Sequence, residues 1–152
     1  MEAIEILIAD SLAGSLSLAR FDGAIASVNA VRSYVPDYTA EELGDLKVSV
    51  VPGETQVTPH THGADLFEID IHVVVGKRMA SDAEIDDLVE LRTNLVDAIR
   101  SKKLPAGETT MPPGVAWMNV TNLVTYDRDQ VTGARVFLAD ISVTYRYANA
   151  KV

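Results

Sequence analysis

The three histidines of this chain lie in one stretch, TPHTHGADLFEIDIHVVVGKR, which runs from Thr58 to Arg78. His60 and His62 are two residues apart, and His72 follows on an alternating apolar run. Two imidazoles from an extended H-x-H segment and a third from a strand form a set that zinc can bind. One hypothesis is therefore a small metal-dependent enzyme, and its alternative is a set of solvent-exposed histidines without a ligand.

A second candidate group lies on the strand that carries His72. Glu68, Asp70 and His72 alternate with apolar residues, so we expect them on one strand face, about 7 Å apart from one to the next. Carboxylates and an imidazole can perform acid–base catalysis when a cleft shifts their pKa values. An exposed polar strand face explains the same pattern without catalysis.

Other sequence signatures of catalysis are missing. The chain has no glycine-rich phosphate loop, no G-x-S-x-G elbow and no H-E-x-x-H motif. It has no cysteine, which excludes disulfides and thiolate metal sites. The segment 127–133 has some calcium-loop composition, but its spacing is wrong, so we expect a hairpin turn there. These observations predict a protein that is not an enzyme, with no catalytic residue, metal or cofactor.

Composition limits the class of protein. The 152 residues, 47% of them hydrophobic, predict a single folded domain over residues 1–152. A net charge of −9 argues against a protein that grips nucleic acid through its phosphates, but not against one that lets nucleic acid slide past. No apolar run is long enough to span a membrane, and the acidic start MEAIEILIADSL does not resemble a signal peptide. We therefore expect a protein made in the cytosol.

Hydrophobic periodicity and turn residues predict an alternation of helices and strands. The expected elements are a helix over 2–20, a helical turn over 40–44, a strand over 46–53, a loop over 54–63, a strand over 65–77, a helix over 81–100, a loop over 105–114, and two final strands around a turn at 127–133. This order predicts an α+β domain with an antiparallel (mixed) β-sheet and helices packed on one face.

The second face of such a sheet has to meet something. In the last strand Asp140 lies among polar residues that alternate with Phe137, Ala139 and Ile141, which predicts a polar second face. That face can meet solvent, a neighbouring copy or the lumen of a ring. The lone Trp117 and the long loop before it, which contains Met111, are candidates for an interface because aromatic residues and methionine are enriched there.

Four segments together resemble a known group of proteins. They are AVRSYVPDYTAEELGDLKVSVVPG from Ala30, FEIDIHVVVGKR from Phe67, EIDDLVELRTNLVDAI from Glu84 and ARVFLADISVTYRY from Ala134. In this order they resemble the neck and minor tail proteins of tailed bacteriophages, and within these the tail-terminator or tail-completion group. The resemblance covers about three-quarters of the chain and departs from the group at loops 54–63 and 105–114.

The resemblance implies a structural protein of the virion, made in the bacterial cytoplasm and without catalytic residues. Such proteins form a ring, commonly a hexamer, that caps the tail tube and joins it to the head while DNA passes through the centre. The implied partners are copies of the chain itself, the tail tube protein and a head-closure or adaptor protein, with no membrane. Tail terminator, head-closure adaptor and another neck ring remain alternatives.

Within this hypothesis the candidate residues receive structural roles. Glu68, Asp70, His72 and Asp140 are candidates for a lumen or a subunit interface. The candidate partner-contacting residues are His60, His62, Met111 and Trp117, in or beside the two loops.

Overall fold

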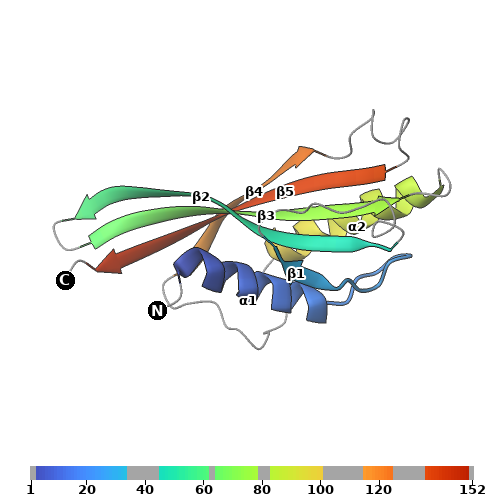
Figure 1. The fold of residues 1–152 in the computed structure, drawn as a ribbon, viewed down its shortest axis with the longest axis horizontal. Helices are drawn as coiled ribbons and strands as arrows, with labels where there is room; N and C mark the ends of the chain where they lie inside the picture. Colours follow the sequence, from blue (N-terminus) through green and yellow to red (C-terminus); the bar gives the residue numbers. More distant parts are fainter. Residues whose placement is uncertain are drawn as a thin grey trace.

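The structure is a computed structural model and describes residues 3–33, 45–61, 64–78, 83–100, 115–124 and 136–150 (Figure 1). The helical turn expected over 40–44, the loop over 105–114 and the turn over 127–133 lie outside the described residues. The elements are α1 (Ile4–Leu18), β1 (Ala30–Arg32), β2 (Lys47–Thr61), β3 (Ala64–Arg78), α2 (Ala83–Arg100), β4 (Val115–Val124) and β5 (Val136–Ala150).

The strands form one mixed sheet in the order β1-β2-β3-β5-β4. β1 runs parallel to β2, and every other neighbouring pair is antiparallel. The centre of the sheet is the pair β3 and β5, which stays in register without a bulge from Ala64 opposite Ala150 to Arg78 opposite Val136. The predicted α+β class, with a largely antiparallel sheet and helices on one face, is confirmed.

Both helices cover the same face of the sheet. α1 packs against β1 and β2, and α2 packs against β4 and β5 (Figure 1). Apolar side chains at three- and four-residue spacing drive this packing. The helix residues buried in the core are Ile8, Ala9, Leu12, Ala13 and Leu16 of α1 and Leu88, Leu91, Leu95 and Ile99 of α2. None of the helices that the structure describes is long and apolar enough to cross a bilayer.

The sheet supplies the other half of the core through alternate residues. On β3 and β5 the buried side chains are Ile69, Ile71, Val73, Val75, Phe137, Ala139, Ile141, Val143 and Tyr145. Complete burial of one valine or isoleucine stabilises the fold by about 1.5–3 kcal/mol. The alternation expected from the sequence over residues 65–77 is therefore confirmed, and it fixes which side chains face away from the helices.

The predicted loop over 54–63 is wrong as far as Thr61, because β2 continues through this segment. A bulge between Pro52 and Thr55 absorbs the Pro-Gly pair without ending the strand. The Val50 carbonyl accepts a hydrogen bond from the Ser33 N–H on the β1 side. The backbone N–H and C=O of Val50 therefore point away from β3. Pro52 and Pro59 occupy equivalent outward positions, where a missing N–H costs no bond to β3.

The short strand β1 was not expected from the sequence, and contacts to α1 hold it in place. The Ser17 hydroxyl oxygen accepts a hydrogen bond from the Ala30 N–H at 2.9 Å and lies 2.9 Å from the Ala13 carbonyl oxygen. Arg32 at the end of β1 forms an ion pair with Asp10. These contacts are made by single polar side chains, which leave no periodic pattern in the sequence.

The connection between α1 and β1 is fixed on α2. Gly23 has a φ of 138°, a backbone conformation that side chains with a Cβ rarely adopt. A Cβ there would also overlap the carboxylate of Glu90. Asn94 donates a hydrogen bond of 2.8 Å to the Asp22 carbonyl oxygen. One turn of α2 therefore holds this connection and, through it, the position of α1.

Burial of one tyrosine predicts loss of stability in alkali. Burial raises the pKa of Tyr145 above its ordinary value of 10.0, because the phenolate cannot be solvated in the core. The native state then keeps a proton that the unfolded chain loses above pH 10. The contribution of Tyr145 is complete below pH 10 and falls by up to about 1.4 kcal/mol per pH unit above it.

Urea unfolding of wild type and Tyr145→Phe between pH 8 and pH 11 measures this contribution. We expect the free energy of unfolding of the wild type to fall more steeply above pH 10 than that of the variant. Parallel curves for the two proteins would contradict the assignment.

Candidate functional site

The polar face of the sheet carries the residues that sequence analysis singled out. Glu68, Asp70 and His72 alternate with buried residues of β3, so they lie on the face away from the helices. Asp140 lies on the same face of the neighbouring strand β5. The structure thus brings the four predicted lumen or interface residues onto one surface, which we call the polar face.

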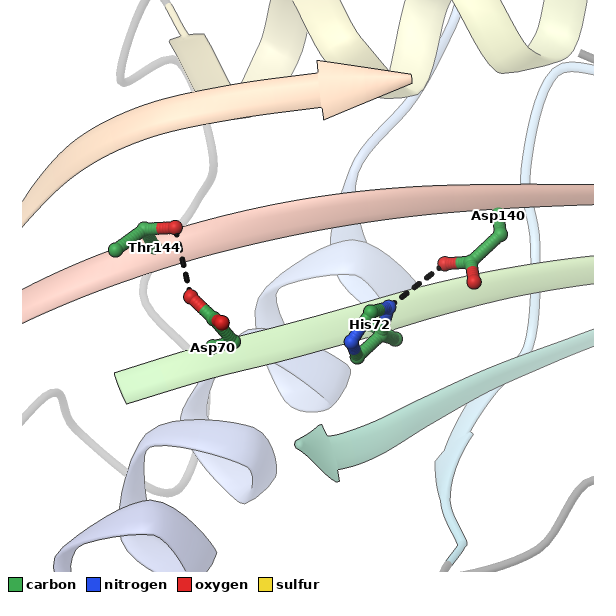
Figure 2. Close-up of polar contacts among 4 residues, drawn as sticks. All are labelled: Asp70, His72, Asp140 and Thr144. Atoms are coloured by element: carbon green, nitrogen blue, oxygen red, sulfur yellow. Dashed lines mark hydrogen bonds and ion pairs between the residues drawn. The ribbon is translucent and has the colours of Figure 1, made fainter. Parts of the chain in front are cut away.

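Each of these β3 side chains has a partner on β5, and Figure 2 shows the contacts of Asp70 and His72. The Thr144 hydroxyl donates a hydrogen bond of 2.8 Å to Asp70 Oδ1. His72 Nδ1 lies 2.9 Å from Asp140 Oδ1, diagonally across the two strands. Arg146 Nη2 lies 3.9 Å from Glu68 Oε1, and both side chains are exposed. The three contacts form a polar ladder along the β3–β5 pair.

The charge of this ladder is predominantly negative. Glu68, Asp70 and Asp140 contribute three carboxylates, and Arg146 contributes one guanidinium. Exposed ion pairs such as Glu68–Arg146 contribute about 0–1 kcal/mol to stability, so the ladder is not needed to hold β3 and β5 together. Its side chains are partly exposed and remain accessible to a partner.

The orientation of His72 depends on a glycine in β2. A Cβ at Gly53 would lie 2.8 Å from His72 Cδ2, 3.0 Å from His72 Nε2 and 2.9 Å from the Asp70 carbonyl oxygen. The imidazole edge therefore packs against the bulged backbone of β2, while Nδ1 points to β5. Gly53 and Asp140 hold the ring from opposite sides.

Ser142, His72 and Asp140 have the residue types of a hydrolase triad but not its geometry. Ser142 lies directly opposite His72 in the β3–β5 register, and Asp140 accepts from Nδ1. A triad needs His72 Nε2 to face the serine hydroxyl. Nε2 faces Gly53 on β2 instead, on the other side of β3 from Ser142. The arrangement therefore orients the imidazole without activating a nucleophile.

The proposed three-histidine metal site does not assemble within one chain. His72 lies opposite Val51, whereas His60 follows nine positions later on β2, so their backbones are about 25–30 Å apart. Zinc ligands have to meet within about 2 Å of one ion. Among the described residues no group of three His, Asp or Glu side chains could hold a metal ion. His62 lies outside the described residues.

The four predicted partner-contacting residues have different outcomes. His60 belongs to β2 near its end, so it lies on a strand and not in the predicted loop. Trp117 lies in β4, where its backbone pairs with Tyr145. His62 and Met111 lie outside the described residues.

The β5 side of the ladder and the glycine beside it were not predicted from the sequence. Thr144 and Arg146 were not assigned to Asp70 and Glu68, because a single strand pattern does not give the cross-strand register. A pairing of the two central strands would have identified both partners. Ser49 lies on the same strand face as Lys47 and is fully buried, with 0% of its surface exposed.

The chain matches no known protein-family model, and a search of curated proteins finds no match either.

Packing of His72 against Gly53 predicts a strong effect of a single methyl group. Gly53→Ala should lower the free energy of unfolding by about 1–3 kcal/mol, because the Cβ displaces the imidazole and the Asp70 carbonyl. Thermal or urea unfolding measures the loss. In a His72→Ala background the same substitution should cost less, because the ring is gone. Equal costs in the two backgrounds would show that His72 does not pack on Gly53.

Proposed function

We propose that this chain is a structural subunit of the neck of a tailed bacteriophage. In this role it forms a ring, expected to be a hexamer, that terminates the tail tube and joins it to the head while DNA passes through. The proposal makes the protein a virion component with no catalytic activity. Its partners are further copies of the chain, the tail tube protein and a head-closure or adaptor protein.

The observation that carries the proposal is the polar face. The polar side chains of its ladder pair with one another along β3 and β5 and do not converge on a common point, as ligands of a substrate or metal would. The face is broad because the β3–β5 register runs without a break over both strands. Such a surface suits repeated contacts or the wall of a channel better than a binding pocket.

The sign of the charge favours a wall that does not hold DNA. The three carboxylates of the ladder outnumber its one guanidinium and repel a phosphate backbone, so a ladder turned inward would give DNA no strong binding position along these residues. The net charge of −9 for the whole chain acts in the same direction. The four sequence segments that resemble tail-terminator proteins favour a place in the neck, and the polar face offers a physical reason for the residues found there.

Imaging tests the proposal directly. The purified chain, alone and mixed with tail tubes of the same virus, is examined by negative-stain electron microscopy, with mass measured by light scattering. We expect rings, or tubes capped at one end. Rings that bind isolated heads and leave tubes uncapped would place the protein at the head-closure position instead. A monomer or dimer that ignores both would contradict a neck function.

Charge reversal tests the orientation of the polar face. Glu68→Lys with Asp70→Lys replaces two negative charges by two positive ones, so a lumen lined by this face should then hold DNA electrostatically. We expect at least a tenfold drop in infectious particles at unchanged protein folding, scored by plaque titre and circular dichroism.

The matched control is Glu68→Gln with Asp70→Asn, which removes the charges but keeps the shape and the acceptor for Thr144. This variant should assemble and remain largely infectious. Normal titres from the lysine variant would exclude the lumen assignment and leave the face available as a subunit contact.

A further inference from the structure

We propose that neighbouring copies of this chain contact each other head to tail, through an apolar row at the tip of the β2–β3 hairpin of one copy and the C-terminal end of α1 of the next. This inference rests on the proposed ring and specifies the surfaces that would build it. The two surfaces lie at different ends of the molecule, and both are on the helix-covered side of the sheet.

The tip row crosses four strands. Val57, Phe67, Tyr147 and Val115 lie side by side in the registers of β2, β3, β5 and β4. Phe67 belongs to the same strand face as Ile69 and Ile71, so the row continues the hydrophobic core. The Phe67 and Tyr147 rings are in contact, with centroids 6.0 Å apart.

The helices cover the rest of this face, but the row lies beyond their ends. The hairpin and the end of β5 project beyond both helices at the left of Figure 1. Phe67, Tyr147 and Val115 are partly buried, whereas 54% of Val57 is exposed. The row therefore ends in an exposed apolar side chain, and its partly buried members adjoin that side chain, so a protein partner seated on Val57 would extend the core.

Two prolines disfavour an added strand along this part of β2. Strand addition needs outward N–H groups along the edge, and the outward positions 52 and 59 are prolines. The bulge after Pro52 also twists the edge out of a regular ladder. These features favour a contact at the tip through the side chains of the apolar row.

The C-terminal end of α1 offers a matching surface. Leu18 is 53% exposed, and the exposed Arg20 follows it. At the tip, Asp65 lies on the same strand face as Phe67, two residues away. Leu18 beside the basic Arg20 therefore complements the apolar row beside the acidic Asp65. This complementarity favours a second copy of this chain as the partner that binds the tip.

The two surfaces lie far enough apart for one copy to contact two neighbours. Ser17 is hydrogen-bonded to Ala30, and Ala30 pairs with Val48, so α1 ends beside the start of β2. Val57 lies nine positions further along the strand, about 25–30 Å away. Because the two surfaces differ, one copy can use its tip on one neighbour and its α1 end on another, and a contact used in this way repeats from copy to copy until a ring closes.

Cysteine cross-linking tests this contact, because the natural chain contains no cysteine. Leu18→Cys protein is mixed with Val57→Cys protein under mild oxidation, and cross-linked dimer is measured on a non-reducing gel. The matched control replaces Val57→Cys by Val31→Cys, because Val31 is also 54% exposed but lies on the opposite face of the sheet. We expect the tip mixture to give at least about tenfold more mixed disulfide, since contact raises the effective concentration.

The outcomes separate the contact from the ring. Tip-selective cross-linking supports the contact, whether or not the same protein caps tail tubes. Rings or capped tubes without tip selectivity would leave the proposed function in place and overturn the contact. Val57→Cys that cross-links mainly with itself would also overturn it, in favour of an isologous dimer. Absence of both cross-linking and rings would overturn the contact and the ring together.

Discussion

The unbroken register between β3 and β5 is the constraint on which the rest of this structure depends. Side chains of paired strands alternate together, so one register assigns every residue of both strands to a face. Ile71 and Val143 meet in the core, and Asp70 and Thr144 meet on the other side. A slip by one residue would bury the carboxylates and expose the core. The apolar content of alternate positions therefore fixes the polar ladder as well as the hydrophobic core.

Irregularity is concentrated at the flanks of this central pair. β2 has a bulge after Pro52, β4 has two register shifts, and β1 is only three residues long. The bulge in β2 has a positive role, because it brings the Gly53 backbone against His72. In a regular strand a residue with a side chain at this position would occupy the space that the His72 ring now fills. The orientation of the imidazole is thus a property of three strands, with β2 and β5 acting from either side of β3.

Sequence analysis was most successful where one periodic pattern settles the outcome. The helix that contains Leu88, Leu95 and Ile99 and the alternation around Ile71 were expected correctly, because long apolar patterns reflect burial on one side. The 54–61 segment was misassigned because Pro52-Gly53 and Pro59 are usual turn residues. The strand tolerates these prolines because their backbone nitrogens face away from β3, and the sequence does not show which side of β2 faces β3. That information is tertiary, as are the Asp140–His72 contact and the placement of β1.

The outward prolines of β2 also bear on how this chain behaves at high concentration. Stacked cross-β assemblies grow by adding strands to a flat edge that offers unpaired N–H groups. On β2 the edge beyond β1 is interrupted at Pro52 by a bulge and a missing donor, and again at Pro59. Fibril growth from this edge would have to skip both positions. The prolines of this long exposed strand therefore oppose the addition of further strands to it. Aggregation of the folded chain through the β2 edge is disfavoured at high concentration.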